Sequence, residues 1–119
     1  MRLRPVAVVA EDDPAVRKLL ARVLDELGFY VIAVSDGLQA LYAARWRHPE
    51  LVITDDRMPD MTGSELVREL RADARFDRTR VIVFSGGAGD GTGADRIVPK
   101  TEGLGALVRA IRETTGGGR

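Results

Sequence analysis

The chain lacks several residue types on which common enzyme and metal chemistries depend. Its 119 residues include no cysteine, one histidine and one tryptophan, and aromatic residues make up only 5%. Disulfide bonds, thiolate nucleophiles and cysteine-ligated metals are therefore excluded. The single histidine, His48, stands before Pro49 at the expected end of a helix. Because the helix dipole favours it there, we do not interpret His48 as a phosphohistidine.

The chain also lacks a charge excess and a long apolar run. Its 18 basic and 18 acidic side chains give a formal net charge of zero. Because non-specific binding to nucleic acid needs a basic excess, we expect no direct nucleic-acid binding. The first apolar run, 6–10, is too short for a signal-peptide core or a membrane span. We therefore expect a cytoplasmic protein that does not contact a membrane.

What is present is an alternation of short apolar runs and helical patterns. The length suits one compact domain, which we place at 1–115, with the glycine-rich 116–119 as a disordered tail. Asp13-Pro14 is typical of a helix start, Gly28 of a helix end, and Thr62 with Glu65 of a capping box. The predicted strands are 6–10, 29–34, 51–54, 80–84 and 96–98, and the predicted helices are 14–27, 38–47, 62–72 and one through 104–111.

This alternation predicts an α/β fold whose parallel sheet has helices on both faces. In such sheets ligands bind at the carboxyl ends of the strands. The residues that follow the predicted strands are therefore the candidate functional residues. They are Glu11 and Asp12 after the first strand, Asp55 after the third, Ser85 after the fourth and Lys100 after the fifth.

The acidic members of this set indicate a metal site. Carboxylates that converge repel one another unless a cation lies between them. Oxygen ligands without histidine or cysteine suit Mg²⁺. A carboxylate beside Mg²⁺ can attack a phosphoryl group, and a hydroxyl and an ammonium can bind the phosphoryl oxygens. The sequence therefore predicts a phosphoryl-accepting site with Mg²⁺ as its cofactor, and Asp56 as a solvated loop residue outside it.

Two segments resemble the receiver domains of bacterial response regulators. They are VVAEDDPAVR at 8–17 and PELVITDDRMPDMTG at 49–63, and the similarity extends over about 5–114. By position, the resemblance implies that Asp55 is the phosphoacceptor and that Glu11 and Asp12 are the acidic pair. It further implies a metal ligand in the backbone carbonyl of Arg57, a switch hydroxyl in Ser85 and a phosphate-binding lysine in Lys100.

The resemblance also carries expectations for fold and partners. It implies a flavodoxin-like, doubly wound five-stranded parallel sheet with strand order 2-1-3-4-5. It implies a signalling switch in a two-component phosphorelay rather than an enzyme, with at most slow self-phosphorylation and dephosphorylation. The expected partner is a sensor histidine kinase or a phosphotransfer protein, together with a downstream protein that the sequence does not identify.

The sequence departs from the family pattern in three places. Thr101 follows Lys100 where the family has proline, and Ile97 replaces an aromatic residue. The interval from Ser85 to Lys100 is shorter than the family's by about two turns of helix. Since 86–93 contains five glycines, we expect a glycine-rich loop in place of the fourth helix. Part of the fourth strand and the flank of the last helix should then be less covered than usual.

Two alternative functions follow from the same residues. The altered features around Ile97 favour a pseudo-receiver, which has lost phosphorylation and serves as a docking module, whereas the intact acidic set argues against it. Residues 89–94 match the G-x-G-x-x-A form of a dinucleotide-binding fingerprint. That motif needs a helix that opens from its glycines, and here 95–100 has the pattern of a strand instead.

Overall fold

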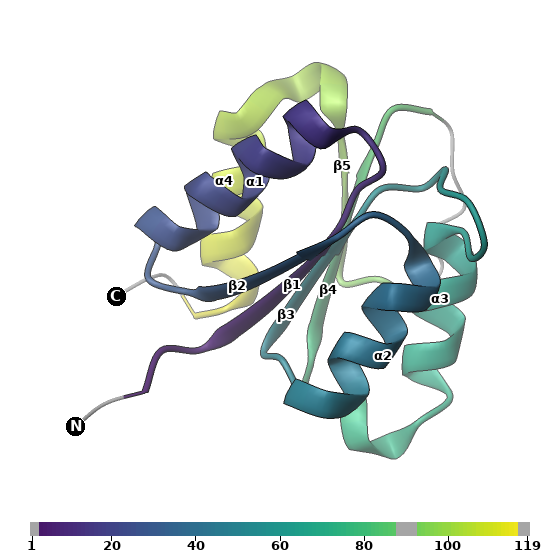
Figure 1. Cartoon of the computed structure of the whole chain (residues 1–119). Helices are drawn as coiled ribbons and strands as arrows, with labels where there is room; N and C mark the ends of the chain where they lie inside the picture. Colours follow the sequence, from purple (N-terminus) through teal and green to yellow (C-terminus); the bar gives the residue numbers. More distant parts are fainter. Residues whose placement is uncertain (1–2, 88–92, 117–119) are drawn as a thin grey trace.

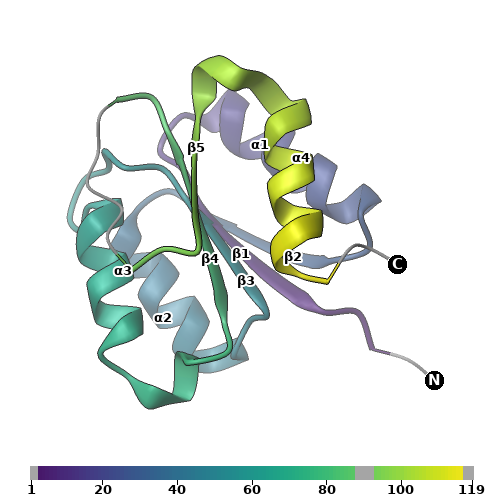
Figure 2. The same cartoon turned by 180° about the vertical axis from the view of Figure 1, so that it is seen from behind.

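The computed structural model describes residues 3–87 and 93–116, and it has a five-stranded parallel sheet between two helical layers (Figures 1 and 2). The strand order is β2-β1-β3-β4-β5, so the predicted flavodoxin-like arrangement is confirmed. The elements are β1 (Val6–Ala10), α1 (Pro14–Glu26), β2 (Tyr30–Val34), α2 (Gly37–Arg47), β3 (Leu51–Thr54), α3 (Gly63–Arg71), η1 (Ala74–Phe76), β4 (Arg80–Ser85), β5 (Arg96–Pro99), η2 (Lys100–Glu102) and α4 (Gly103–Thr114).

The central strands are apolar throughout because both of their faces are covered. In β1, Val8 pairs with Ile32 of β2 on one side and with Val52 of β3 on the other. All four residues of β3 are buried. Continuous apolar runs of this kind are typical of strands inside a parallel sheet. The register aligns the carboxyl ends of β1 and β3, so the residues that follow them emerge side by side.

Each face of the sheet has its own core. On one face, α1 and α4 pack on the sheet through Leu20, Leu24, Leu107 and Ile111. On the other face, α2 and α3 pack through side chains that include Leu41 and Leu66. In the described part of the chain, no helix is long and apolar enough to cross a membrane.

The helix termini form as their sequence signals predict. The Asp13 side chain accepts hydrogen bonds from the backbone N–H groups of Ala15 and Val16 at the start of α1. Gly28 follows α1 with φ of +100°, a conformation in which L side chains are strained. The Thr62–Glu65 capping box is present at the start of α3. These local signals fix where α1 and α3 begin and where α1 ends.

The connection from β4 to β5 contains no helix among the residues described there, 86–87 and 93–95. The centre of the predicted glycine-rich loop, 88–92, lies outside the described residues. The expectation that β4 would be less covered is wrong, because Val81 and Val83 are buried in the same core as Val67 of α3. The exposure falls instead on β5, where Ile97 is 49% exposed.

Candidate functional site at the carboxyl edge of the sheet

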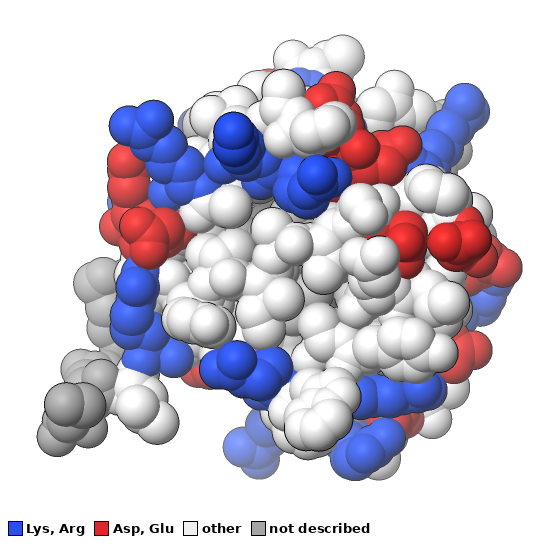
Figure 3. Space-filling model, in the orientation of Figure 1, with Lys and Arg blue, Asp and Glu red and all other residues white. Residues whose placement is uncertain are grey.

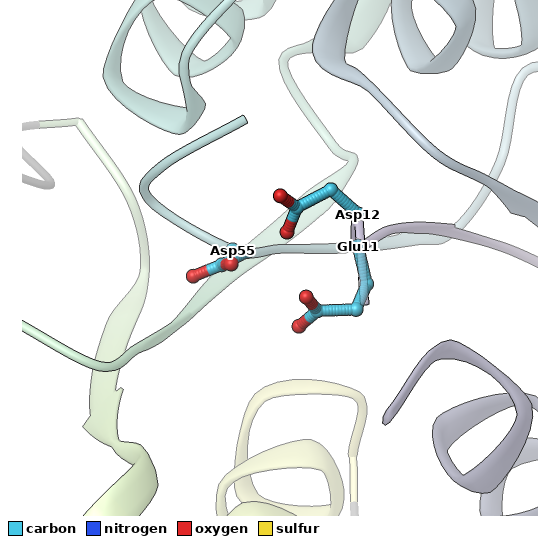
Figure 4. Close-up of side chains that lie close together, drawn as sticks. All are labelled: Glu11, Asp12 and Asp55. Carbon is cyan, nitrogen blue, oxygen red and sulfur yellow. The ribbon is translucent and has the colours of Figure 1, made fainter. Parts of the chain in front are cut away.

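Three carboxylates meet at the carboxyl ends of β1 and β3 (Figure 4). Glu11 and Asp12 follow β1 directly, and Asp55 follows β3. Each residue offers one carboxylate oxygen, and these oxygens all lie within 4.8 Å of one another. The backbone N–H of Asp55 donates to the carbonyl of Ala10 at 2.9 Å, which ties the two strand ends together. The convergence expected from the sequence is therefore present.

Glu11 is the most buried member of this acidic cluster, with 1% of its surface exposed. Its Oε2 accepts the backbone N–H of Asp13 at 3.1 Å, and its Oε1 accepts the ammonium of Lys100 at 2.9 Å. Burial raises the pKa of Glu11 above the usual glutamate value, and the nearby charge of Asp55 adds to this. The hydrogen bonds from Lys100 and Asp13 oppose the shift without cancelling it.

Lys100, which follows β5, contacts both Glu11 and Asp55 of the acidic cluster. Its Nζ lies 2.9 Å from Glu11 Oε1 and 3.4 Å from Asp55 Oδ2. Partial burial alone lowers the pKa of Lys100, but the hydrogen bond to Glu11 and the charges of Glu11 and Asp55 outweigh it and raise the pKa. Lys100 is therefore held as a cation beside Asp55.

The loop after β3 fixes the position of Asp55. Asp55 Oδ1 accepts the backbone N–H of Asp56 at 2.7 Å, and its carbonyl accepts the buried hydroxyl of Thr54 at 2.8 Å. Gly63 at the start of α3 packs against that same carbonyl, and a Cβ at this position would lie 2.1 Å from the oxygen. Only glycine fits this approach, so α3 and the loop after β3 are in direct backbone contact.

An open depression of about 270 Å³ lies over Asp55. Its lining residues are Asp55, Asp56, Arg57, Gly86, Gly87 and Lys100. The depression brings the loop after β3 together with the chain that leaves β4, as expected for parallel strands whose carboxyl ends share an edge. Its size and its combination of a carboxylate with an ammonium suit a small anionic group.

The remaining predicted residues are placed as follows. Arg57 lines the depression, and the role of its carbonyl as a ligand stays a prediction. Ser85 ends β4 but is 2% exposed, and its hydroxyl donates to the Gly87 carbonyl at 2.7 Å. The Ser85 hydroxyl thus faces its own loop in this structure. Asp56 lies outside the acidic cluster, and its Oδ1 accepts the hydroxyl of Ser64 at 3.3 Å.

The donor set fits a hard divalent cation. Three carboxylates against the single ammonium of Lys100 leave an excess of negative charge at the cluster of Glu11, Asp12 and Asp55. All the side-chain donors are oxygens, which Mg²⁺ and Ca²⁺ prefer. A bound cation would also relieve the repulsion that contributes to the raised pKa of Glu11.

Sequence reasoning missed two residues that support this site. Arg17 of α1 donates from Nη1 to the Glu11 carbonyl at 2.8 Å and to the Asp12 carbonyl at 3.5 Å. It therefore braces the backbone that carries both acids. Gly63 lies within the second family motif, which does not by itself indicate its contact with Asp55. The only sequence signal for the role of Arg17 is its position six residues after Glu11, in the first turns of α1.

Solved structures of receiver domains share this fold. The receiver domain of a sensor histidine kinase from Pseudomonas aeruginosa, solved with a magnesium ion coordinated in its active site cleft, superposes with a TM-score of 0.86 at 24% identity, covering 97% of this chain and 100% of that one. A chemotaxis response regulator of Vibrio cholerae gives 0.83 at 21% identity, covering 94% and 99%. The receiver domain of the hybrid histidine kinase CckA gives 0.78 at 28% identity, covering 92% and 98%.

The similar curated sequences belong to much longer proteins. Hybrid signal transduction histidine kinase D of Dictyostelium discoideum is 32% identical over 82 residues, which are 69% of this chain and 5% of that protein. Sensor protein EvgS of Escherichia coli is 47% identical over 64 residues, or 54% and 5%. DNA-binding response regulator MtrA of Mycolicibacterium smegmatis is 40% identical over 72 residues, or 60% and 32%.

The family assignment rests on a match over nearly the whole chain. The model of the response regulator receiver domain matches residues 7–112, a range that includes every residue of the candidate site. The topology, the acidic cluster and this match agree, and the chain belongs to the receiver domain family of response regulators.

Proposed function

We propose that this receiver domain is a phosphorylation switch that accepts a phosphoryl group on Asp55. The observation that carries the proposal is the position of the Asp55 carboxylate. It lies in the depression, beside Asp12 and Glu11 and 3.4 Å from the ammonium of Lys100. A nucleophilic carboxylate among charges that neutralise a phosphoryl group is the arrangement that phosphoryl transfer requires.

The transfer step uses groups that the chain already positions. A carboxylate oxygen of Asp55 attacks phosphorus, the new O–P bond forms, and the bond from phosphorus to the donor's nitrogen or oxygen breaks with its electron pair on the donor. The backbone N–H of Asp56 holds one oxygen of Asp55, which fixes the orientation of the carboxylate. Lys100 is within reach of Asp55 and is placed to donate to the phosphoryl oxygens.

Mg²⁺ is the cofactor that we assign to this site. Asp12, Asp55 and the carbonyl of Arg57 would bind it, with Glu11 close behind them. When bound, Mg²⁺ supplies positive charge that neutralises the carboxylates and the incoming phosphoryl oxygens. The magnesium in the cleft of the similar receiver domain from Pseudomonas aeruginosa supports this choice.

The phosphoryl donor that fits is a phosphohistidine on a sensor histidine kinase or on a phosphotransfer protein. The similar curated sequences support this choice, because they include sensor and hybrid kinases as well as a response regulator. Slow loss of the phosphoryl group to water would be a side reaction of the same site. We therefore assign the domain a role in signalling rather than in metabolic catalysis.

Intact-mass measurement tests this function directly. With acetyl phosphate and Mg²⁺, the wild type should gain the mass of one phosphoryl group, and Asp55→Asn should abolish the gain. Asp56→Asn is the matched control, because it removes a neighbouring carboxylate outside the acidic cluster and should still be labelled. If the wild type stays unmodified while an ordinary receiver is labelled in parallel, the domain is a docking module instead.

A further inference from the structure

The two acids that follow β1 are held in different ways. The carboxylate of Glu11 is buried and has two partners, the backbone N–H of Asp13 at 3.1 Å and the ammonium of Lys100 at 2.9 Å. Asp12 is exposed, and no donor in the described part of the chain forms a hydrogen bond with its carboxylate. Figure 4 shows this carboxylate directed to the side on which Asp55 lies. Its place in the acidic cluster therefore depends on the backbone of Asp12.

Arg17 of α1 holds that backbone. Its Nη1 donates to the carbonyl of Glu11 at 2.8 Å and to the carbonyl of Asp12 at 3.5 Å. The first of these bonds is short, and the second is weaker because of its length. A guanidinium carries five donors in one rigid plane, so a single end of it can serve two neighbouring carbonyls. Arg17 thus bonds to the chain at the point where it leaves β1.

The turn between β1 and α1 is fixed from both sides. The backbone N–H of Glu11 donates to the Val34 carbonyl of β2 at 3.0 Å, which continues the sheet. On the other side, the N–H of Arg17 donates to the Asp13 carbonyl at 2.8 Å, and the Asp13 side chain caps the helix. The half-buried side chain of Arg17 reaches back over the turn from which its own helix starts. Asp12 therefore projects from a turn that is ordered before any ion binds.

The charge of Arg17 acts differently from that of Lys100. Lys100 contacts carboxylate oxygens of Glu11 and Asp55 directly. Among the described residues, Arg17 forms no ion pair, and both of its hydrogen bonds go to carbonyl oxygens. Arg17 therefore leaves the carboxylate oxygens available to a cation. Its contribution to such a site is the position of the ligands rather than the neutralisation of their charge.

The other basic residues of α1 do not share this role. The helix contains Arg17, Lys18 and Arg22. Figure 3, in the orientation of Figure 1, shows basic side chains along α1 and acidic side chains next to them where the helix begins. Arg22 pairs with Glu26 of the same helix at 3.7 Å, and its side chain is 80% exposed. Among these three residues, only Arg17 bonds to the described residues that carry the acidic cluster.

We propose that Arg17 is a positioning residue that sets the affinity of the site for Mg²⁺ by holding Asp12 in place. The inference rests on the Mg²⁺ site proposed above and adds a residue that offers no ligand oxygen. Mg²⁺ demands a nearly ideal octahedral geometry, so a ligand carboxylate that must first be ordered binds it less tightly. Arg17 lowers this cost because the carbonyls of Glu11 and Asp12 already have their donor.

The direction of the change in Mg²⁺ affinity tests the proposal. Arg17→Gln removes a positive charge near three carboxylates, which by itself would tighten Mg²⁺ binding, whereas the loss of positioning weakens it. We expect the dissociation constant for Mg²⁺ to rise at least about tenfold. Arg17→Lys keeps the charge and a donor, and it should recover part of the lost affinity. Thermal unfolding of the whole chain across a Mg²⁺ titration gives these constants.

Arg22→Gln is the matched control, because it removes the same charge from an exposed position of α1 and should leave the dissociation constant unchanged. Labelling with acetyl phosphate should show the same split. For Arg17→Gln, the rate should fall at limiting Mg²⁺ and return to within about twofold of the wild-type rate at saturating Mg²⁺. A lower free energy of unfolding with an unchanged constant for Mg²⁺ would mean that Arg17 only stabilises the fold, and it would overturn the proposal. Tighter Mg²⁺ binding by Arg17→Gln would overturn it as well.

The Mg²⁺ titration contains no phosphodonor, so it separates this inference from the phosphorylation of Asp55. A wild type that binds Mg²⁺ but accepts no phosphoryl group would contradict the proposed function. The comparison of Arg17→Gln with Arg22→Gln would then still decide the role of Arg17. A wild type that binds no Mg²⁺ would overturn the inference about Arg17 itself.

Discussion

Charged side chains are buried to different extents at the carboxyl and amino edges of the sheet. At the carboxyl edge, the side chains of Glu11 and Asp55 are only 1% and 11% exposed, and one lysine reaches both of them. At the amino edge, ion pairs such as Arg4 with Asp25 and Arg75 with Asp73 are more open to solvent. Exposed pairs add little to stability, whereas buried and incompletely compensated carboxylates oppose folding.

This difference separates the residues that stabilise the fold from those that serve function. A chain selected for stability alone would not bury Glu11 with a raised pKa beside two further acids. At the amino edge, the Arg4 guanidinium donates to the carbonyls of Asp25 and Gly28 at the end of α1, and the Asp95 carboxylate accepts the backbone N–H of Val81 in β4. Substitutions at the two edges should therefore differ in the property that they change.

The largest effect is expected at Gly63. The Cβ of Gly63→Ala would lie 2.1 Å from the carbonyl oxygen of Asp55, so either α3 or the acceptor loop must move. We expect a loss of about 2 kcal/mol or more in the free energy of unfolding. Denaturant titration gives this value, and labelling with acetyl phosphate should fall with it because Asp55 is displaced.

Gly105 provides the matched control for Gly63. It lies in α4, where a Cβ would meet nothing closer than the Arg109 guanidinium at 3.8 Å. Gly105→Ala should stabilise the protein by about 0.5 kcal/mol, because alanine loses less backbone entropy on folding. Equal effects of the two substitutions would show that the contact between Gly63 and Asp55 does not hold the acceptor loop.

The next largest loss of unfolding free energy is expected at Asp95, at the amino edge. Its Oδ2 accepts the backbone N–H of Val81 at 2.7 Å and lies 2.9 Å from Arg71 Nη2. Asp95→Ala leaves that N–H without its partner, which should cost about 1–3 kcal/mol of unfolding free energy. Asp95→Asn keeps an acceptor for Val81 and should cost less, and phosphoryl labelling of Asp55 should survive in both variants.

A solvent-exposed ion pair provides the control for Asp95→Ala. Glu113→Gln breaks the pair of Arg96 with Glu113, whose side chains are 44% and 59% exposed. It should change the free energy of unfolding by less than about 0.5 kcal/mol. A loss as large as that of Asp95→Ala would mean that charge, rather than the satisfied N–H of Val81, stabilises this edge.

The sequence predicted the features that depend on local patterns. The apolar runs gave the five strands, and the signals at Asp13, Gly28 and Thr62 gave the helix termini that the structure confirms. The rule that parallel strands share a carboxyl edge is sufficient to predict that Glu11, Asp12 and Asp55 lie together, as the structure confirms. Periodicity and topology are sufficient for these features because each depends on a few neighbouring residues.

The features that sequence reasoning missed depend on contacts between distant segments. That Lys100 binds phosphate stays a prediction, and the sequence does not indicate its ion pair with Glu11, from which it is separated by most of the chain. The fit of Gly63 against Asp55 and the bond from Val81 to Asp95 likewise arise only after the elements pack. Exposure was misjudged for the same reason, since α3 covers β4 and Ile97 of β5 remains open.

A smaller effect is expected when magnesium is added. Mg²⁺ that binds only the folded protein raises the free energy of unfolding. Asp12→Asn should weaken Mg²⁺ binding at least about tenfold, equivalent to about 1.4 kcal/mol. Asp56→Asn should change it little, because Asp56 lies outside the acidic cluster and its Oδ1 accepts the Ser64 hydroxyl. Thermal unfolding across a Mg²⁺ titration measures both, and equal losses would show that one carboxylate is misassigned.

Thermal unfolding is preferable here to the fluorescence of Trp46. Trp46 is the last but one residue of α2, which starts at the carboxyl edge and runs away from it. The residue is therefore at the far end of the helix from the acidic cluster. A change in its emission on adding Mg²⁺ would therefore not report directly on binding at Asp55.

The smallest effect concerns the titration of Asp73, an acid whose pKa moves in the opposite direction to that of Glu11. The side-chain and backbone hydrogen bonds from Arg75 lower the pKa of Asp73 from 3.8 to about 2. A carboxyl with a lowered folded-state pKa stabilises the fold above its unfolded pKa, and this contribution is lost as the pH falls. The loss should thus occur between about pH 4 and pH 2. Glu11, with its raised pKa, should protonate at higher pH than an ordinary glutamate.

Carboxyl-detected NMR titration can resolve both residues in one experiment. Arg75→Gln removes the charged partner of Asp73, so the pKa of Asp73 should return toward 3.8 while that of Glu11 stays raised. The destabilisation caused by Asp73→Asn should likewise be present at pH 6 and shrink as the pH falls below about 4. If Glu11 and Asp73 each titrate at the usual pKa of their residue type, then burial does not raise the pKa of Glu11 and pairing with Arg75 does not lower that of Asp73.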